Sequence, residues 1–443
     1  MPAESSVNEF IEAVLAGNAV TVERLLVADP ALPGADLYAA AVSGNLSAVT
    51  SMLRDNPSLA LLKGGPREWE PMLYASFSRG FAHAGRPAPD RAGVVRLLLD
   101  AGADPNTSYI EEHFPDSPQS ALYGATGVAN DPAVAEALLS AGADPNDGES
   151  IYHAAEGNHR ECLELLLHYG ADPSARGIPW NNTPLYFLLG YREGQKESAT
   201  EGACWLLEHG ADPNVTSYEI AETPLHLAVR NGRRRATVAM LLDHGADSDL
   251  PNARGLTPFA LAMRFGNREA MELLRERGAD TTLSVVDRLL GACFSGDHGG
   301  LREILADRPD LIASLPAEDC APLIDAAANN NITALRSMLD AGFDIATTGE
   351  GGATALHHAA WRGQEDAVAM ILAYHPPLDV RCSAYRGTPM DWALHGSTNC
   401  GNPDGNYAGI VERLIAAGAD IPDVDWGSVT VVDLLRRVRA ADC

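Results

Sequence analysis

A recurring three-residue stop constrains this sequence more than any other feature. Gly-Ala-Asp occurs at 102–104, 142–144, 170–172, 210–212, 245–247, 278–280 and 418–420, with Gly-Phe-Asp at 342–344. The first six stops lie between 28 residues (142 to 170) and 40 residues (102 to 142) apart. Each follows apolar residues at helical spacing, and glycine readily takes the left-handed conformation that ends a helix. The sequence therefore predicts a repeated helical unit.

Residues 221–249 are the most regular copy of that unit. Thr223-Pro224 begins a first helix, because threonine caps free N–H groups and proline at the first helical position loses no needed donor. Asn231-Gly232 ends this helix, and residues 236–243 form a second one with apolar residues at helical spacing. Two helices this short cannot bury their apolar faces alone, so neighbouring units must stack.

The unit resembles the ankyrin-repeat family, whose repeat is about 33 residues long and opens its first helix with TPLHxA. Residues 223–228, TPLHLA, match this opening, and graded departures stand at 183–186, 257–260, 354–357 and 388–391. The resemblance covers about residues 7–425. It implies an all-α ankyrin-repeat solenoid of about twelve helix-turn-helix units, with β-hairpin fingers beside a concave groove lined by the first helices.

The spacing predicts twelve helix pairs and a last helix, about 428–440, that caps the C-terminal end. The pairs are expected at 7–29, 35–59, 69–102, 118–143, 149–171, 183–211, 223–245, 257–279, 285–308, 319–343, 353–376 and 387–419. The first pair lacks the family opening and is expected to be an N-terminal cap. The ninth pair resembles the first two and lacks the usual stop, which indicates a restart near 281–285. We therefore expect a first repeat block at 1–281 and a second at 282–443.

Insertions interrupt the period at a few places. Those at 80–91, 192–202 and 397–407 fall between first and second helices, and the one at 107–119 enlarges a turn between repeats. Long loops in compact folds are often functional. These insertions are either tolerated surface loops or walls of a binding site.

Composition narrows the classes of function. The 32 basic and 60 acidic residues give a net charge of −28, which repels phosphates and disfavours nucleic-acid binding. No apolar run approaches the roughly 20 residues of a membrane helix, and the N-terminus lacks a secretory signal. Seven scattered cysteines without a CxxC pair are typical of reduced thiols in a cytoplasmic protein. No nucleotide or metal motif occurs, so we expect no cofactor and no metal.

The fourth to sixth repeats carry the strongest local anomaly. Aligned on their helix openings, Glu156 stands between Gly127 and Gly190, and Gly124 lies one turn before Gly127. Because stacked helices lie about 8–10 Å apart, we expect a hollow with the Glu156 carboxylate at its floor. Such a hollow resembles a small-molecule pocket. The side chains expected to line or cover it are Tyr109, His113, Phe114, Tyr123, Trp180, Tyr186, Tyr191, Arg192, Tyr218 and Arg230.

Three residues of the fifth repeat are candidates for catalysis. Tyr152 and His153 precede Glu156 by four and three residues, so either can reach it along a helix. Such a group does general acid–base work when burial raises the pKa of the glutamate. The alternatives are a solvated Glu156 at a helix end and a hydrogen-bonded core histidine at 153. Tyr123, Tyr152 and Tyr186 stand where the family has histidine, and their hydroxyls are expected to replace its structural hydrogen bonds.

Two further groups concern binding. Arg230 belongs to a basic patch that either pairs with the chain's own carboxylates or receives an anionic group of a ligand. Near the C-terminus, two neighbouring first helices, 354–363 and 388–397, bring aromatic and polar side chains together. Asp391 and His395 are four residues apart and are expected to pair. This second group, expected to bind a protein partner, comprises Trp361, Arg362, Asp391, Trp392 and His395.

Two functions are compatible with these features. The first is a scaffold that binds a protein or peptide partner through its concave face and fingers, with Trp, Tyr and Arg as anchors. The second is a cofactor-free small-molecule enzyme, a hydrolase, lyase or isomerase, with an acid–base pocket around Glu156 in the fourth to seventh repeats. The family's usual role favours the scaffold, which is an analogy of fold.

Overall fold

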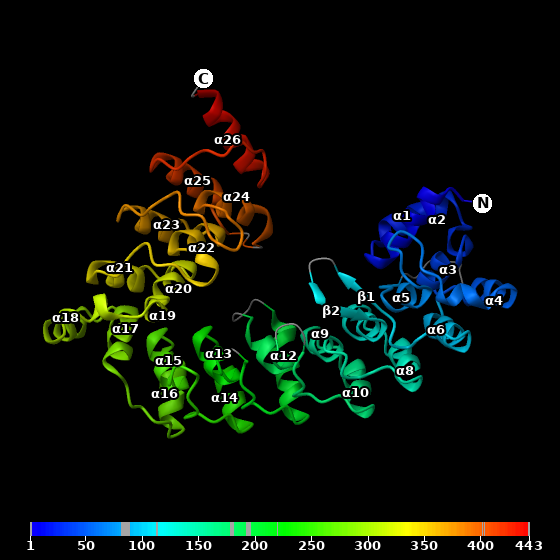
Figure 1. Ribbon diagram of the computed structural model, residues 1–443, viewed down its shortest axis with the longest axis horizontal. Helices are drawn as coiled ribbons and strands as arrows, with labels where there is room; N and C mark the ends of the chain where they lie inside the picture. Colours follow the sequence, from blue (N-terminus) through cyan, green and yellow to red (C-terminus); the bar gives the residue numbers. More distant parts are fainter. Residues whose placement is uncertain are drawn as a thin grey trace. The chain divides into compact units, whose positions relative to one another are not determined.

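The computed structural model describes residues 2–80, 89–111, 114–177, 181–191, 196–218, 220–400, 402 and 404–441. The chain forms two compact units, Met1–Pro258 and Phe259–Cys443. Each unit is a series of helix pairs in chain order (Figure 1). The predicted all-α solenoid, its twelve helix pairs and its last helix are confirmed. The unit boundary lies one repeat before the predicted restart at 281–285, and each unit is described separately below.

Unit 1 holds seven helix pairs, a single two-stranded sheet among its described residues, and short 3₁₀ and π turns. Its elements are α1(Glu4–Leu15), α2(Ala19–Ala28), η1(Leu32–Gly34), α3(Leu37–Ser43), α4(Leu46–Asp55), η2(Pro57–Leu61), α5(Pro71–Ser76), α6(Arg91–Asp100), β1(Ser108–Glu111), β2(Phe114–Ser120), α7(Ala121–Tyr123), η3(Gly124–Val128), α8(Pro132–Ser140), α9(Ser150–Glu156), α10(Arg160–His168), α11(Pro184–Leu189), α12(Glu197–Glu208), α13(Pro224–Arg230) and α14(Arg235–Asp243).

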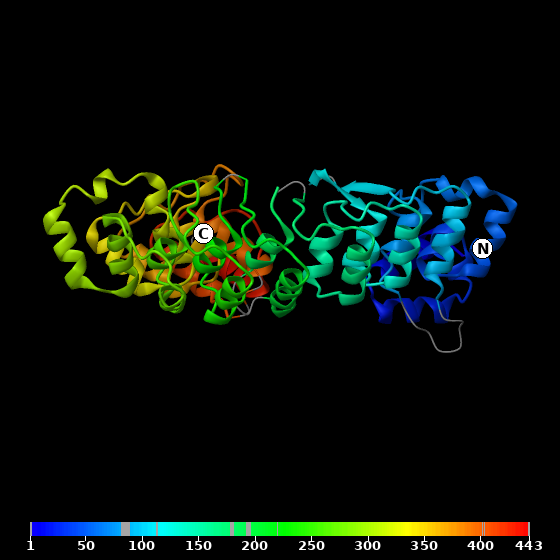
Figure 2. The ribbon, with the colours of Figure 1, turned by 90° about the horizontal axis from the view of Figure 1, so that it is seen from below.

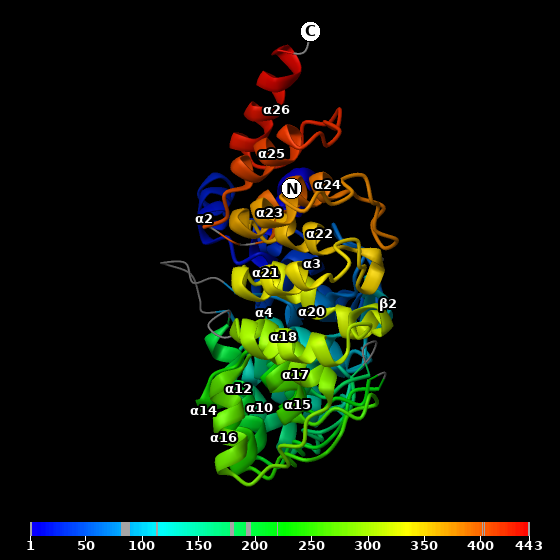
Figure 3. The same ribbon diagram turned by 90° about the vertical axis from the view of Figure 1, so that its left-hand side faces the viewer.

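Unit 2 holds five helix pairs and ends with α26, which lies beyond α25 (Figure 3). Its elements are α15(Pro258–Arg264), α16(Arg268–Glu276), α17(Val285–Ser295), α18(His298–Asp307), η4(Ile312–Ser314), α19(Ala317–Cys320), α20(Pro322–Ala328), α21(Ile332–Ala341), η5(Glu350–Gly352), α22(Ala355–Trp361), α23(Glu365–Leu372), α24(Pro389–Asn399), α25(Tyr407–Ala416) and α26(Val429–Ala441).

The TPLH opening explains how a first helix begins and how it is fastened to the next repeat. The Thr223 hydroxyl accepts the His226 amide (3.3 Å), while His226 Nδ1 accepts the Thr223 amide (3.2 Å). On its other side, His226 Nε2 lies 3.0 Å from the carbonyl oxygen of Leu256 in the following turn. Thr354 and His357 repeat the arrangement in unit 2. One imidazole therefore caps a helix and links two repeats.

The Gly-Ala-Asp stops are joined by an asparagine ladder. Asn106 donates to the Gly142 carbonyl (3.3 Å) and accepts the Asp144 amide (2.8 Å). Asn146 makes the same two bonds to the stop at 170–172, and Asn214 makes them to the stop at 245–247. These bonds satisfy carbonyl groups that a helix end leaves without partners. The stop is thus a junction between repeats as well as a helix terminator.

The predicted fingers are only partly formed by strands. The strands β1 (Ser108–Glu111) and β2 (Phe114–Ser120) pair antiparallel and run along one edge of the unit 1 helices (Figure 2). Elsewhere in the described residues only the isolated bridges Gly64–Trp69 and Thr348–Thr354 occur. The predicted insertion at 192–202 is shorter than expected, because α12 already begins at Glu197. Most of the insertion at 80–91 lies outside the described residues.

A buried ion triad ties three repeats of unit 2 together. Arg264 Nε lies 2.5 Å from Asp287 Oδ1, and Arg264 Nη1 lies 2.5 Å from Asp319 Oδ1. The three residues come from α15, α17 and α19 and are all buried. Asp287 also accepts the Ser284 amide (2.7 Å), which caps α17. By contrast, α18 buries only Leu301.

Among the described helices, none is long and apolar enough to cross a membrane.

Candidate functional site

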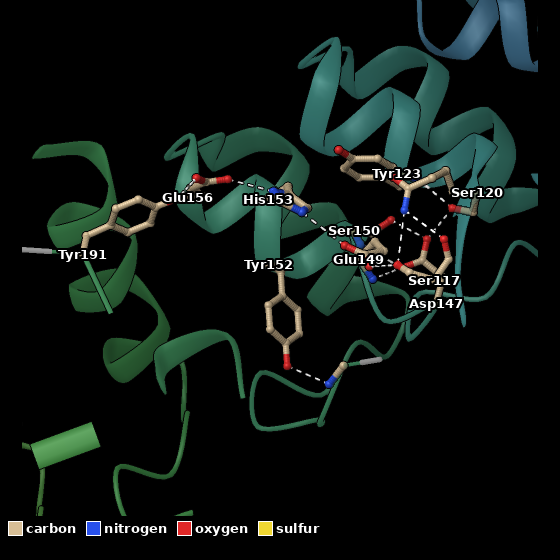
Figure 4. Close-up of polar contacts among 12 residues, drawn as sticks. Ser117, Ser120, Tyr123, Asp147, Glu149, Ser150, Tyr152, His153, Glu156 and Tyr191 are labelled. Atoms are coloured by element: carbon tan, nitrogen blue, oxygen red, sulfur yellow. Dashed lines mark hydrogen bonds and ion pairs between the residues drawn. The ribbon is translucent and has the colours of Figure 1, made fainter. Parts of the chain in front are cut away.

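Glu156, at the end of α9, is the centre of a polar network in unit 1. Its carboxylate lies 2.7 Å from His153 Nδ1 and 2.7 Å from Lys196 Nζ, and it accepts a hydrogen bond from the Tyr191 hydroxyl. His153 Nε2 lies 3.1 Å from Glu149, which in turn accepts the Ser117 hydroxyl (Figure 4). The network joins β2, α9 and the segment before α12. Only 14% of the Glu156 side chain is exposed.

A close helix contact brings these groups together. A Cβ atom at Gly202 of α12 would lie 1.9 Å from the Ala155 carbonyl oxygen of α9, so only glycine allows this approach. The Ser198 hydroxyl donates to the Glu156 carbonyl (2.8 Å) at the same junction. The start of α12 is thereby held against the end of α9, which places Lys196 beside the Glu156 carboxylate.

The charge state of the network differs from the one expected for a catalytic acid. Burial raises the pKa of Glu156, but the hydrogen bonds from His153, Lys196 and Tyr191 outweigh it and lower the pKa to about 2. Burial lowers the pKa of His153, but its bonds to Glu149 and Glu156 outweigh that effect and raise it to about 9. The prediction of a raised Glu156 pKa is wrong, because the carboxylate gains three donors. At neutral pH the pair is an ionised glutamate and an imidazolium.

The hollow expected beside Glu156 is filled at Gly124 and Gly127. A Cβ atom at Gly124 would lie 2.4 Å from the Phe77 ring, and one at Gly127 would lie 2.7 Å from His153 Cβ. Tyr123 packs between these two side chains, with ring centroids 5.7 Å from Phe77 and 5.0 Å from His153. Gly124 and Gly127 therefore accommodate ring-bearing residues of neighbouring repeats rather than leaving space for a ligand.

Tyr152 does not reach Glu156. Its hydroxyl donates to the Asn182 carbonyl and accepts the Gly177 amide (2.6 Å), both in the turn of the following repeat (Figure 4). This is the link that His226 makes two repeats later. The expected replacement of the family's histidine bonds is therefore observed at Tyr152. The catalytic role of Glu156, His153 and Tyr152 stays a prediction. The position of Tyr152 does not support it, because the Tyr152 hydroxyl does not reach Glu156.

Arg230 is occupied by the chain itself. It lies 2.9 Å from the buried carboxylate of Glu222, at the turn before α13. Burial raises the pKa of Glu222 although Arg230 opposes the effect, so the property expected of Glu156 occurs here instead. Tyr186 adjoins this pair, and burial followed by the Glu222 charge raises its pKa. The helical spacing of the sequence did not point to Glu222, because this residue precedes α13 and does not lie on the apolar face of a helix.

The other residues predicted to cover the hollow are dispersed. Tyr109 packs on Trp69 with ring centroids 4.3 Å apart, and Tyr218 is exposed. Tyr191 binds Glu156 as described. His113, Trp180 and Arg192, and the side chain of Phe114, lie outside the described residues.

In unit 2 the structure brings all five predicted partner-binding residues into one pocket of about 500 Å³, here called the aromatic pocket. Nine residues line it: His358, Trp361, Arg362, Tyr385, Gly387, Asp391, Trp392, His395 and Trp426. The first helices α22 and α24 supply most of them, and these two helices pack against each other. The predicted register of neighbouring first helices is thus sufficient to place these side chains together.

The rings of the aromatic pocket form a continuous wall. Trp392 lies at its centre, with ring centroids 6.2 Å from Trp361 and 6.1 Å from Tyr385, both at steep angles. His395 stacks on Trp361 at 5.1 Å and meets the edge of Trp426 at 6.4 Å. Edge-to-face and stacked contacts of this kind stabilise aromatic clusters. Tyr385 is 80% exposed and Trp426 is 43% exposed.

The expected pair of Asp391 and His395 does not form. Asp391 Oδ2 accepts the Thr388 amide (2.8 Å) and hydroxyl (2.9 Å), which completes a capping box at the start of α24. His395 Nδ1 instead lies 3.2 Å from the Asn399 side-chain amide. Asp391 therefore takes over the capping role of the family's histidine.

Two exposed aromatic residues of the pocket, Tyr385 and Trp426, were not predicted from the sequence. Tyr385 lies in the turn before α24, and Trp426 lies in the segment before α26. Neither residue lies on a helix face with a periodic pattern. The only feature of the sequence that could have indicated them is an aromatic residue within a polar loop between helices. In the described part of the chain, no cluster of three or more His, Cys, Asp or Glu residues has the geometry of a metal site.

Comparisons with known proteins agree with the repeat architecture. Models of ankyrin repeats match residues 120–217, 191–284 and 323–372. An ankyrin repeat and KH domain-containing protein of Caenorhabditis briggsae is 27% identical over 354 residues, which cover 74% of this chain and 12% of that protein. The human ankyrin repeat and SOCS box protein 11 is 32% identical over 126 residues, which cover 28% of this chain and 36% of that protein. The crystal structure of the human ASB11 ankyrin repeat domain aligns with a TM-score of 0.42 at 23% identity, covering 56% of this chain and all of that one.

The chain spans about one eighth of the length of the Caenorhabditis relative. The matched segments include the TPLHLA unit, the asparagine-linked stops at 170–172 and 245–247, and some of the helix pairs of each unit. Ankyrin repeats generally serve as scaffolds for protein–protein interaction. On these grounds the chain belongs to the ankyrin-repeat proteins.

Proposed function

We propose that this chain is a scaffold that binds a protein or peptide partner over the first helices of unit 2, with an anchoring side chain in the aromatic pocket. The observation that carries the proposal is the convergence of three tryptophans, a tyrosine and an arginine on one pocket. These residue types dominate the energetics of protein interfaces.

The exposure of the pocket's rim supports the same function. Tyr385 and Trp426 leave much of their apolar surface in contact with water. Burying apolar surface contributes about 25 cal/mol per Å², so covering these rings with a partner would stabilise a complex. Concentrated exposed aromatic surface with a polar rim is typical of an interaction site.

The alternative of a small-molecule enzyme at Glu156 has less support. All three donors around Glu156 are supplied by the chain, and Phe77, Tyr123 and His153 occupy the space beside Gly124 and Gly127. An ionised carboxylate held in this way is suited to joining repeats. The Glu156 network is therefore assigned a structural role in this proposal.

A peptide selection tests the proposed function. Random dodecapeptides displayed with free N-termini, and a second set with free C-termini, are selected against the full chain. Affinities of enriched peptides are then measured by fluorescence anisotropy. Tyr385→Ala and Trp426→Ala are expected to weaken binding at least tenfold each, since hot-spot aromatics contribute about 2 kcal/mol or more.

Tyr374→Ala is the matched control, because Tyr374 follows α23 and its hydroxyl binds Asp340 on α21, away from the pocket. We expect it to leave peptide affinity unchanged. If no enriched peptide from either library loses affinity in the Tyr385 and Trp426 variants, the aromatic pocket is not the partner site.

A further inference from the structure

Arg362 is a charged group of the aromatic pocket whose guanidinium has no hydrogen-bond or ion-pair partner among the described residues. It follows Trp361 at the C-terminal end of α22 and lines the pocket. Its Nε–H is buried and donates to no acceptor among the described residues. No hydrogen bond or ion pair of its guanidinium to any described residue is observed either.

Comparison with the other arginines that bury an Nε–H shows that this is unusual among them. Arg230, Arg233 and Arg439 also bury an Nε–H without a partner. Each of them uses its terminal nitrogens: Arg230 on Glu222, Arg233 on Tyr191 and Thr200, and Arg439 on Asp425 and two carbonyls. Within the described residues, Arg362 alone of this group has no such compensation.

A buried donor without an acceptor costs free energy, and the cost is larger when the group is charged. A ligand that supplies an acceptor removes this cost. The guanidinium is always charged and has a planar fork of donors that fits a carboxylate. Arg362 therefore favours an anionic group at its end of the pocket.

The pocket's remaining charge indicates a monoanion. Asp391 also lines the wall, so the fixed charges are one cation and one anion. Asp391 is engaged by Thr388 and does not neutralise Arg362. A phosphate dianion would be repelled by Asp391 and would find only one permanently charged donor. A carboxylate has half that charge and matches a single guanidinium.

The size and lining of the pocket indicate how many residues of a ligand can enter it and which groups they carry. A volume of about 500 Å³ holds one to two residues, within the range of about 300–1,000 Å³ typical of ligand pockets. Neighbouring side chains of an extended peptide point to opposite faces, so an acidic side chain and an adjacent apolar one cannot both enter. The last residue of a chain carries its carboxylate and its side chain within one residue.

We infer that the aromatic pocket binds the C-terminal residue of a partner polypeptide, with its free carboxylate on Arg362 and its apolar or aromatic side chain against Trp361, Trp392 and Trp426. This inference rests on the proposed function and specifies the chemistry of the partner at that site.

The test compares free and blocked C-termini. Peptides enriched from the library with free C-termini are synthesised as acids and as C-terminal amides, and their dissociation constants for the full chain are measured. The acid is expected to bind at least tenfold more tightly than the amide. Arg362→Gln should reduce this ratio to about one, and Arg362→Lys should retain part of it because the charge persists without the fork.

Arg336→Gln is the control, since Arg336 is exposed on α21, away from the pocket. It removes the same charge from the same unit, and we expect the full ratio of acid to amide affinity. N-acetylphenylalanine is measured as well. If it competes as well as the peptides, the site binds small carboxylates and the inference of a partner's C-terminus is wrong.

Other outcomes separate this inference from the proposed function. Equal binding of acids and amides overturns the inference, as does enrichment of peptides only from the library with free N-termini. In both cases the proposed function stands if Tyr385→Ala still weakens binding. Loss of that dependence on Tyr385 overturns the proposed function itself.

Discussion

The carboxylate of Glu156 receives donors from two neighbouring repeats, and this explains why its pKa lies far below the expected one. Sequence spacing showed that His153 could reach it along α9. It did not show Lys196 or Tyr191, which come from the sixth repeat through the close contact of Gly202 with Ala155. Contacts within a helix follow from spacing, whereas contacts between repeats depend on how closely their helices approach.

Glu156→Gln is expected to lower the free energy of unfolding at pH 7 by about 1–3 kcal/mol, because it removes a buried, charge-assisted acceptor. The folded pKa of about 2 lies below the unfolded value, so this contribution is present at neutral pH and is lost only as pH falls toward 2. Urea denaturation measures it. Glu161→Gln, at an exposed position on α10, should change stability by less than about 0.5 kcal/mol. Equal effects of both changes would contradict the network.

His153 predicts the opposite dependence on pH. Its folded pKa of about 9 lies above the unfolded value, so its ionic contribution is complete below about pH 6.5 and disappears as pH rises through 9. His153→Gln should therefore destabilise the protein by about 1–3 kcal/mol at pH 6 and clearly less at pH 9.5. His168→Gln should cost under about 0.5 kcal/mol at both pH values. A stability loss in His153→Gln that grows with pH would contradict the raised pKa of His153.

Among the elements, the first helices show most clearly what a sequence can predict. Recurring openings, stops and apolar spacing placed twelve helix pairs correctly, and the openings set the register that gathers Trp361, Trp392 and their neighbours in one pocket. The prediction failed where side chains of one repeat fill space left by another. Phe77 of the third repeat occupies the room beside Gly124 of the fourth, and no pattern within a single repeat records this compensation.

The ion triad of α15, α17 and α19 should dominate the stability of unit 2. Arg264→Met leaves Asp287 and Asp319 buried without their cation, and removing one partner of a buried pair costs about 3–5 kcal/mol. We expect a loss of this size in urea denaturation followed by circular dichroism. Adding Asp287→Asn and Asp319→Asn should recover part of it. No recovery in the triple variant would show that Arg264 acts by packing alone.

At the scale of the whole molecule, a solenoid's stability is approximately a sum over repeats and their nearest neighbours. Glu156 belongs to the fifth repeat and Arg264 to the eighth, and they share no partner among the described residues. The double variant Glu156→Gln with Arg264→Met should therefore lose the sum of the two single losses within about 0.5 kcal/mol. A double-mutant cycle measures this, and a coupling above about 1 kcal/mol would show that the two units do not behave independently.

Repeat proteins commonly change length by gaining or losing whole copies, since each copy meets only its neighbours. The ion pair of Arg264 with Asp319 does not allow such a change, because it joins repeats that are not neighbours. It joins the eighth repeat to the start of the tenth, with the ninth between them. Removing or duplicating the ninth repeat would change the spacing of this buried cation from its two counter-ions. This segment is thus a fixed block of three copies, and designs that lengthen or shorten the chain are best made elsewhere.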